Sequence, residues 1–315
     1  MQLQQLSYFL AVARTRHFTR AAEVLGVAQP SLSKQIRALE TELGAALFSR
    51  ARGNITLTPA GEALFPLANR ILADVDTARR EVQELAGLRR GRVRVGATPS
   101  LSSGLLADVL RRFRDTYPGI ELLVEESGSR DLVRELTRGA LDLALVILPL
   151  ADDTPLVTAP ILREDLMVAA RAGALPNRRY LRITDLRDRP LVMFRSGYDL
   201  REATIKACRS AGFEPRFAVE GGEMDAVLRF VEVGLGVAVV PSMVLAGRPA
   251  LRGIPLSIDG GSPGLHRTVA LAHRKDVAPT NAATAFRATL EGFLIEAAAD
   301  TSLPAGVESL VVTGG

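Results

Sequence analysis

Residues 18–43, FTRAAEVLGVAQPSLSKQIRALETEL, decide the fold of the N-terminal part of this chain. The stretch has the pattern of two short amphipathic helices joined by a tight turn. Apolar residues recur at helical spacing in its first half, and Gly26 follows directly, where a helix C-terminus tolerates a left-handed residue. Pro30 suits the first turn of the next helix, because the backbone donor that proline lacks would be unpaired there anyway. We therefore expect a helix, a sharp turn and a second helix.

The second helix of this pair has a cationic and hydroxylated side. Its aliphatic residues fall on one face, and Lys34 and Arg37 fall on the opposite face. Lysine and arginine suit DNA phosphates, while glutamine, serine and arginine form hydrogen bonds with base edges in a major groove. We expect Gln29, Ser31 and Ser33 to contact base edges, and Lys34 and Arg37 to hold phosphates. An ordinary solvated helix face is the alternative.

The distribution of charge favours DNA. Residues 1–58 contain seven Lys or Arg and three Glu, a balance of +4, and the whole chain, with 39 Lys or Arg and 35 Asp or Glu, also has a balance of +4. The positive surplus therefore lies in the segment that carries the helix pair, as an electrostatic footprint on DNA requires.

A possible wing follows the helix pair. Residues 49–58, SRARGNITLT, place a glycine–asparagine turn between two short runs that could form a hairpin. Arg50 and Arg52 would then reach phosphates or the minor groove. A surface hairpin without a partner has the same pattern.

The segment from Leu3 to Thr58 resembles the N-terminal winged helix-turn-helix of the LysR-type transcriptional regulators. The runs that carry the resemblance are LQQLSYFLAVART, FTRAAEVLGVAQPSLSKQIRALETELG, LFSR and LTPAG, in this order. The resemblance implies a DNA-binding domain, a long dimerising helix and an effector-binding domain. It also implies operator DNA and a small-molecule effector as partners, and a homodimer or homotetramer as the assembly.

A long helix is expected after the wing. Thr58 and Pro59 supply a capping hydroxyl and a first-turn proline, and we expect the helix to run to about residue 85 or 86 and to end at Gly87. Aliphatic residues spaced alternately by four and three form a heptad seam along this helix: Leu64, Ala68, Ile71, Val75, Ala78, Val82 and Leu85. The seam predicts a dimer that places two DNA-binding domains on half-sites related by twofold symmetry. A helix lying on the core of its own domain has the same pattern.

The remainder of the chain predicts two α/β lobes. After a polar, glycine-bounded hinge at 88–91, strand-like runs alternate with helices, which implies a mainly parallel sheet with helices on its faces. The two lobes with a cleft between them resemble the effector domain of the family, which is similar in fold to periplasmic solute-binding proteins. The predicted limits are 1–58 for DNA binding, 59–90 for the linker helix and hinge, 91–300 for effector binding (lobe I 91–162 and 266–300, lobe II 163–265) and 301–315 for a peripheral tail.

Candidate effector residues lie at the expected strand ends, because ligands of open parallel sheets collect there, near helix N-termini. Three loops, at 98–103, 128–130 and 195–198, supply hydroxyl, amide and guanidinium groups. From this rule and from the resemblance we expect an effector site made of Thr98, Ser100, Leu101, Ser129, Arg195 and Ser196. The loops suit a small polar or anionic effector, although Glu223 would repel an anion if it faced the cleft. Each loop alone is also an ordinary helix cap.

Several other classes of protein are disfavoured. No apolar run approaches the roughly 18 to 20 residues of a membrane span, and the N-terminus lacks a basic leader, so we expect a cytoplasmic protein. The single cysteine, Cys208, excludes an intrachain disulfide, and its place on a helix favours a buried core thiol over a redox sensor. Scattered histidines and the absence of a serine elbow or phosphate loop predict no enzyme, metal or cofactor. The rival is a solute receptor whose N-terminal helices serve only protein contacts.

Overall fold

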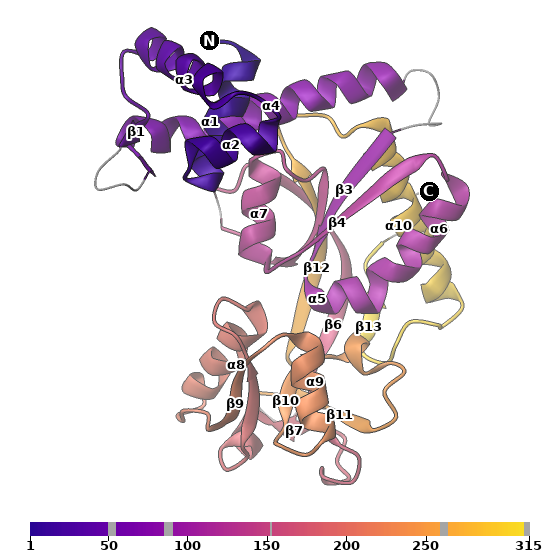
Figure 1. The fold of residues 1–315 in the computed structure, drawn as a ribbon. Coiled ribbons are helices and arrows are strands. Elements are labelled where there is room, and N and C mark those ends of the chain that lie inside the picture. The colour runs from indigo at the N-terminus through magenta and orange to yellow at the C-terminus, as the bar shows by residue number, and fades with distance from the viewer. Residues whose placement is uncertain (50–54, 85–90, 152, 259–263, 312–315) are drawn as a thin grey trace. The chain divides into compact units, whose positions relative to one another are not determined.

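The structure, a computed structural model, describes residues 1–49, 55–84, 91–151, 153–258 and 264–311. It divides into two compact units, Met1–Leu85 with Thr137–Ala140 and Ala86–Leu136 with Leu141–Gly315. The first unit contains the helix pair and the long helix, and the second contains the alternating strands and helices (Figure 1). No helix among the described residues is both long enough and apolar enough to cross a bilayer.

The first unit is a winged helix-turn-helix followed by a long helix, as predicted. Its elements are α1 (Leu3–Thr15), α2 (Phe18–Leu25), α3 (Gln29–Leu43), β1 (Phe48–Ser49), β2 (Thr56–Leu57) and α4 (Pro59–Glu84). Gly26 has a φ of 65° and ends α2, which makes the turn to α3 sharp. The ring of Phe48 lies 5.4 Å from that of Phe9 and 5.8 Å from that of Phe18, so the wing is packed against α1 and α2.

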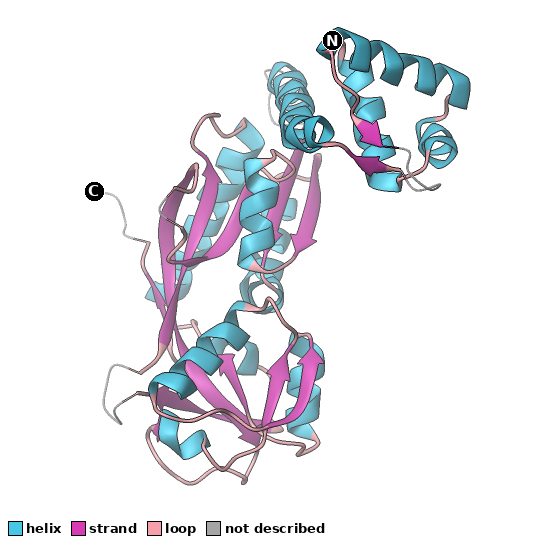
Figure 2. Cartoon of the chain, turned by 90° about the vertical axis from the view of Figure 1, so that its left-hand side faces the viewer, coloured by secondary structure: helices cyan, strands magenta, loops and turns pink. Residues whose placement is uncertain are grey.

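Lobe I of the second unit has a sheet with helices on both faces (Figure 2). Its elements are β3 (Gly91–Ala97), α5 (Pro99–Leu101), η2 (Ser102–Leu106), α6 (Ala107–Thr116), β4 (Ile120–Glu126), α7 (Ser129–Thr137), β5 (Leu143–Leu148) and α10 (Asn281–Ala299). β3 pairs in parallel with β4 and β5. Successive residues of β5 face opposite sides: Leu143 and Leu145 pack in the core with α6 and α10, and Ala144 and Val146 pack in the core with α7.

Lobe II has a separate hydrophobic core. Its elements are β7 (Leu181–Arg182), η3 (Ile183–Leu186), β8 (Leu191–Phe194), α8 (Asp199–Ser210), β9 (Phe217–Gly222), α9 (Met224–Glu232), β10 (Ala238–Pro241), η4 (Ser242–Leu245) and β11 (Leu251–Ser257). β8 and β9 form a parallel pair, and α8 and α9 pack on the strands of this lobe. Two α/β lobes are therefore present, as the sequence predicts.

Two long strands connect the lobes, and here the prediction of a mainly parallel sheet is wrong. β6 (Leu156–Arg171) and β12 (His266–Arg274) run antiparallel to each other, and β5 also pairs antiparallel with β12. The first part of β6 pairs with β12, and its last residues pair with β10 and β11 of lobe II. One strand enters lobe II and the other returns from it, so the two connecting strands must run in opposite directions.

The C-terminal segment is not a peripheral tail, contrary to expectation. β13 (Val307–Ser309) pairs antiparallel with β6 opposite residues 162–164. Leu303, Val307 and Val311 pack against the lobe I core. The segment is ordered because these apolar side chains, spaced by four, are covered by lobe I when the short strand joins the sheet edge.

Candidate nucleic-acid interface and ligand cavity

The third helix, α3, buries one face and leaves the opposite face free. Leu32, Ile36 and Leu39 are fully buried and fix the helix against α1 and α2. Lys34 and Arg37 are exposed, and their side chains have no hydrogen-bond or ion-pair partner among the described residues. Because two unpaired cations stand on a helix whose other face is anchored, this face can meet phosphates without loss of an internal contact.

The polar residues predicted to read bases lie beside these cations. Ser31 is exposed, whereas Gln29 and Ser33 are half-buried. The Gln29 Nε2 donates a hydrogen bond to the Ser33 Oγ, 2.8 Å away, so the two side chains hold each other on one turn of α3. We refer to Gln29, Ser31, Ser33, Lys34 and Arg37 as the cationic face of α3.

The base of the wing is well defined. Phe48 pairs with Leu57 in the β1–β2 ladder, and the Thr58 Oγ1 accepts a hydrogen bond from the Gly61 N–H, which caps the start of α4. Arg50 and Arg52 lie outside the described residues. Their assignment to phosphates or the minor groove is therefore still a prediction.

The heptad seam on α4 divides into two parts. Ala68 is fully buried in the core of the first unit, and Leu64 and Ile71 pack against that core. The head of the same chain thus covers part of the surface of Leu64 and Ile71, and their assignment to a dimer contact stays a prediction. Further along, Val75 is half-buried and Val82 is 70 % exposed.

The end of the seam has a different environment from its beginning. Ala78 is exposed, while Leu85 lies outside the described residues. An exposed valine that continues an aliphatic stripe is the kind of surface that a second helix covers. The dimer contact thus includes, in our interpretation, Val75, Ala78 and Val82 among the described seam residues.

A cavity of 160 Å³ lies between the two lobes, and we call it the inner cavity. Lobe I contributes Thr98 and Ser100, as predicted, together with aliphatic residues of β5, and lobe II contributes residues at the start of α8. Its lining consists of Thr98, Ser100, Ile147, Leu148, Leu166, Tyr198, Asp199, Leu200, Ala203, His266 and Arg267. Five of these eleven side chains are aliphatic, and the other six carry the polar groups that determine the chemistry of the cavity.

Arg267, which lines the inner cavity, belongs to a buried ion pair at the crossing strands. The Nε and Nη2 of Arg267 donate to the Glu164 Oε2 at 2.9 and 2.7 Å, and Nη1 donates to the Ser100 Oγ at 3.0 Å. The Glu164 Oε1 accepts a hydrogen bond from the Met243 N–H at 2.7 Å. We call Glu164 and Arg267 the hinge pair, since they lie on β6 and β12 where these strands pass between the lobes.

Two further polar groups of the inner cavity come from lobe II. The Asp199 Oδ2 accepts a hydrogen bond from the backbone N–H of Ser129 in lobe I, 3.3 Å away. Tyr198 is buried, its ring stacks on that of Phe194 at 4.7 Å, and its hydroxyl has no hydrogen-bond partner among the described residues. Burial raises the pKa of Tyr198, and Glu223 raises it further, so the hydroxyl stays protonated.

A second, outer cavity of 540 Å³ adjoins the first, since Ile147 and Asp199 line both. Ser129 and Arg130 of α7 line it together with residues 149–151. Ser129 was predicted for the effector site and is buried here, where its Oγ accepts a hydrogen bond from the Ile147 N–H. The Arg130 side chain is exposed and has no partner among the described residues.

Three predicted effector residues do not line either cavity. Leu101 is fully buried in the lobe I core, so its assignment is wrong. Arg195 and Ser196 are exposed, and the Arg195 guanidinium forms an ion pair with Glu223, which also raises the pKa of Arg195. The carboxylate suspected of repelling an anion is thus neutralised by this arginine.

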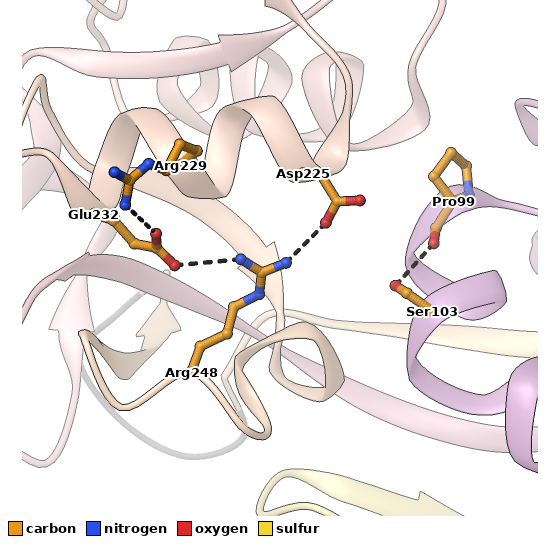
Figure 3. Close-up of polar contacts among 6 residues, drawn as sticks. All are labelled: Pro99, Ser103, Asp225, Arg229, Glu232 and Arg248. Carbon is orange, nitrogen blue, oxygen red and sulfur yellow. Dashed lines mark hydrogen bonds and ion pairs between the residues drawn. The ribbon is translucent and has the colours of Figure 1, made fainter.

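Other polar side chains of the two lobes form hydrogen bonds with nearby groups of their own lobe (Figure 3). The Ser103 Oγ donates to the Pro99 carbonyl within one helical turn, at 3.1 Å. Arg248, in the loop before β11, donates to Asp225 of α9 at 2.8 Å and to Glu232 of α9 at 3.2 Å. The hydrogen bonds to Glu232 from Arg229 and Arg248 lower the pKa of Glu232. None of these residues lines the inner or the outer cavity, and the contacts of Arg248 attach the loop before β11 to α9.

The sequence did not identify Glu164, Tyr198, Asp199 or Arg267 as ligand-site residues. The hinge pair is separated by 103 positions in the chain, so no local pattern relates its members. Arg267 gave no clear signal either, because it stands between His266 and Thr268 at the start of its strand and not within an apolar run.

Cys208 is fully buried in the lobe II core. Burial raises the pKa of its thiol to about 11, with a smaller contribution from Glu214. Because the folded value exceeds the ordinary 9.0, the neutral buried thiol stabilises the fold fully below pH 9.0, and this contribution is lost as the pH rises through about 11. The geometry supports a structural thiol.

A thiol-labelling experiment tests this assignment. At neutral pH a disulfide reagent such as dithionitrobenzoate should label native Cys208 only as fast as the protein opens, and labelling should accelerate as the pH approaches 11. Protein unfolded in guanidinium chloride should react at once and serves as the control. Rapid stoichiometric labelling of the native protein at neutral pH would instead indicate a reactive sensor.

Comparison with known proteins agrees with this architecture. Residues 3–62 match the family described as bacterial regulatory helix-turn-helix protein, lysR family, and residues 86–294 match the LysR substrate binding domain. The chain belongs to the LysR family. This LysR-family chain is a DNA-binding transcriptional regulator with an effector-binding domain.

Individual relatives of this LysR regulator are similar over nearly their whole length. The transcriptional dual regulator GltC of Bacillus subtilis is 33% identical over 278 residues, which cover 88% of this chain and 92% of GltC. The regulator BudR of Raoultella terrigena is 33% identical over 281 residues, covering 87% of this chain and 95% of BudR.

Solved structures of full-length regulators share the fold. An OxyR variant from Pseudomonas aeruginosa has a TM-score of 0.71 and 26% identity, covering 92% of this chain and 95% of that chain. CbnR in complex with its target DNA has a TM-score of 0.68 and 26% identity, covering 93% and 99%.

Proposed function

We propose that this LysR regulator reads operator DNA with the cationic face of α3 and that a small molecule held between its lobes modulates this binding. The observation that carries the proposal is the pair of exposed, unpaired cations Lys34 and Arg37 on a helix anchored by Leu32, Ile36 and Leu39. In this proposal residues 1–58 bind DNA, 59–90 dimerise and 91–300 bind the effector. No catalytic role is proposed, and the site of action is the cytoplasm, where bacterial operators lie.

The two cations and the polar side chains have different tasks. Lys34 and Arg37 neutralise phosphates and so give affinity and register, whereas Gln29, Ser31 and Ser33 offer hydrogen-bonding groups to base edges and so give specificity. The full-length CbnR structure, which contains target DNA, supports DNA binding by this fold through its similarity to the present chain.

Dimerisation supplies a second DNA-binding domain. Val75, Ala78 and Val82 continue the aliphatic stripe of α4 beyond the part covered by the head itself. Pairing of two such stripes would place two α3 helices on half-sites one or more helical turns apart. Inverted-repeat operators follow from the twofold axis.

Replacing Arg37 by alanine tests the DNA contact. Each phosphate contact contributes about 0.9 to the slope of log affinity against log salt, so a dimer that loses two contacts should lose nearly two units of slope. At about 50 mM salt the loss of affinity should be roughly tenfold for each contact. Fluorescence anisotropy with labelled duplex DNA at several salt concentrations measures both quantities.

Lys206→Ala is the matched control, because it removes one exposed cation from α8 in the effector domain. This variant should keep the salt dependence of the wild type. An unchanged slope for Arg37→Ala would remove this residue from the interface. If the wild-type protein bound no duplex DNA even at low salt, the rival solute receptor would be the better explanation.

A further inference from the structure

The charge of the inner cavity differs from that expected of a carboxylate site. Its ionisable lining residues are Tyr198, Asp199, His266 and Arg267. The guanidinium of Arg267 is 7 % exposed and is matched by the fully buried Glu164 carboxylate at 2.7 Å. Since this cation is already neutralised, an incoming carboxylate would have to compete with Glu164 for it.

The other formal charge at the inner cavity is the Asp199 carboxylate. Its Oδ2 accepts a single, rather long hydrogen bond of 3.3 Å from the Ser129 N–H, and its Oδ1 accepts none from the described residues. No lysine or arginine among these residues pairs with it. This carboxylate therefore favours a ligand that carries a hydrogen-bond donor or a positive charge.

The buried hydroxyl of Tyr198 also favours a ligand that carries a hydrogen-bonding group. The hydroxyl is buried without a partner, and such a group costs free energy unless something satisfies it. Burial is the largest cause that raises the pKa of this tyrosine; among the charged groups Glu223 and Glu126 raise it, while Arg267 and Arg195 lower it. The hydroxyl therefore stays protonated and can form a hydrogen bond with a ligand. A ligand head group beside Asp199 can satisfy the hydroxyl as well, because Tyr198 and Asp199 line the same cavity.

The size and apolar lining of the cavity limit the rest of the ligand. Aliphatic side chains from both lobes make up nearly half of the lining residues, namely Ile147, Leu148, Leu166, Leu200 and Ala203. A volume of 160 Å³ is comparable to cavities of about 150 Å³ that admit benzene. The body of the ligand should therefore be apolar and about the size of one aromatic ring.

We propose that the inner cavity takes a small apolar amine, with its ammonium group on Asp199 and its body among the aliphatic side chains, rather than a carboxylate. This inference rests on the proposed effector function of the domain and specifies the effector's chemical class. It also replaces the anionic effector that the loop composition favoured. Arg130 lines the outer cavity, which Asp199 also lines, but it does not line the inner cavity and forms no ion pair with Asp199.

Three probes with the same phenyl body and different charges test the inference on the full-length protein. Benzylamine is cationic, benzyl alcohol is neutral and benzoate is anionic at neutral pH. Isothermal titration calorimetry should give benzylamine an affinity at least about tenfold higher than that of benzoate, with benzyl alcohol between them, because a charge-assisted hydrogen bond forms only with the amine. Thermal shift gives an independent readout, since a ligand of the folded state raises the melting temperature.

Asp199→Asn should bring the affinity ratio of benzylamine to benzoate close to one. Asp188→Asn, which removes an exposed carboxylate of lobe II outside both cavities, should leave the ratio unchanged. Tyr198→Phe is a second variant that should fold normally, because its hydroxyl makes no hydrogen bond in the free protein. Its affinity for benzylamine should fall while its own melting temperature does not.

Benzoate binding as tightly as benzylamine would overturn the inference. So would an amine preference that survives in Asp199→Asn, or a failure of all three probes to bind at millimolar concentration. The DNA-binding experiment with Arg37→Ala uses no ligand, so its outcome separates a wrong ligand class from a wrong function.

Discussion

Replacing Val75 and Val82 together by aspartate should convert the protein into a monomer and lower its affinity for operator DNA by about a hundredfold or more. Both valines lie on the part of the α4 stripe that the head does not fully cover, and Val82 is 70 % exposed. Four carboxylates brought together at a dimer contact would oppose association strongly. A monomer loses the advantage of a linked second head, which commonly contributes factors of about 10² to 10⁴.

Sedimentation velocity and anisotropy titrations measure these two effects on the same sample. Ala73→Asp is the control, because Ala73 lies on α4 about half a helical turn from Val75 and adds the same charge on the opposite face. This variant should stay oligomeric and bind DNA as the wild type does. A Val75→Asp/Val82→Asp protein that still sediments as the wild-type oligomer would show that this stripe is not the contact.

Replacing Arg267 by methionine should lower the free energy of unfolding by about 3–5 kcal/mol, the usual result of removing one member of a buried ion pair. The substitution leaves the Glu164 carboxylate fully buried without its cation, and it also removes the donor to the Ser100 Oγ. Urea unfolding monitored by circular dichroism measures the change, with the midpoint moving to lower urea.

The double variant Glu164→Leu/Arg267→Met distinguishes the charge effect from a loss of packing. With both charges gone, much of the stability lost in the single variant should return, because a buried pair and a well-packed apolar pair are often similar in stability. The Met243 N–H would then lack its acceptor, so recovery should be incomplete. A double variant less stable than Arg267→Met would contradict the assignment of the pair as a charge-matched unit.

Local patterns predicted the first unit well. The spacing of Leu32, Ile36 and Leu39, the glycine at 26 and the proline at 30 are all short-range signals, and each element that they predict is present. Capping by Thr58 was likewise readable from two adjacent residues, since the hydroxyl and the proline act on their own helix. Such features depend on neighbours in the chain.

Features that depend on distant partners were not predictable in the same way. The first part of β6 contains Pro160, which argues against a strand, but its pairing with β12 and β13 makes it one. The chain segment after residue 301 had no trusted periodicity, although three spaced apolar side chains anchor it to lobe I.

The candidate ligand site could likewise be predicted only where its residues depend on local sequence patterns. Thr98, Ser100 and Ser129 were found because strand ends and helix starts can be read from sequence, and all three line a cavity. Leu101 came from resemblance alone and is a core residue. The groups that decide the charge of the inner cavity, Asp199 and the hinge pair, become neighbours only through the packing of two lobes.

Selection of genomic DNA fragments by the purified protein, followed by sequencing, tests the central claim most directly. The wild-type protein should enrich fragments that share an inverted repeat with half-sites one or more helical turns apart, and the Lys34→Ala/Arg37→Ala protein should not enrich them. Equal enrichment by both proteins, or no enrichment by the wild type, would contradict a gene regulator that reads DNA with α3.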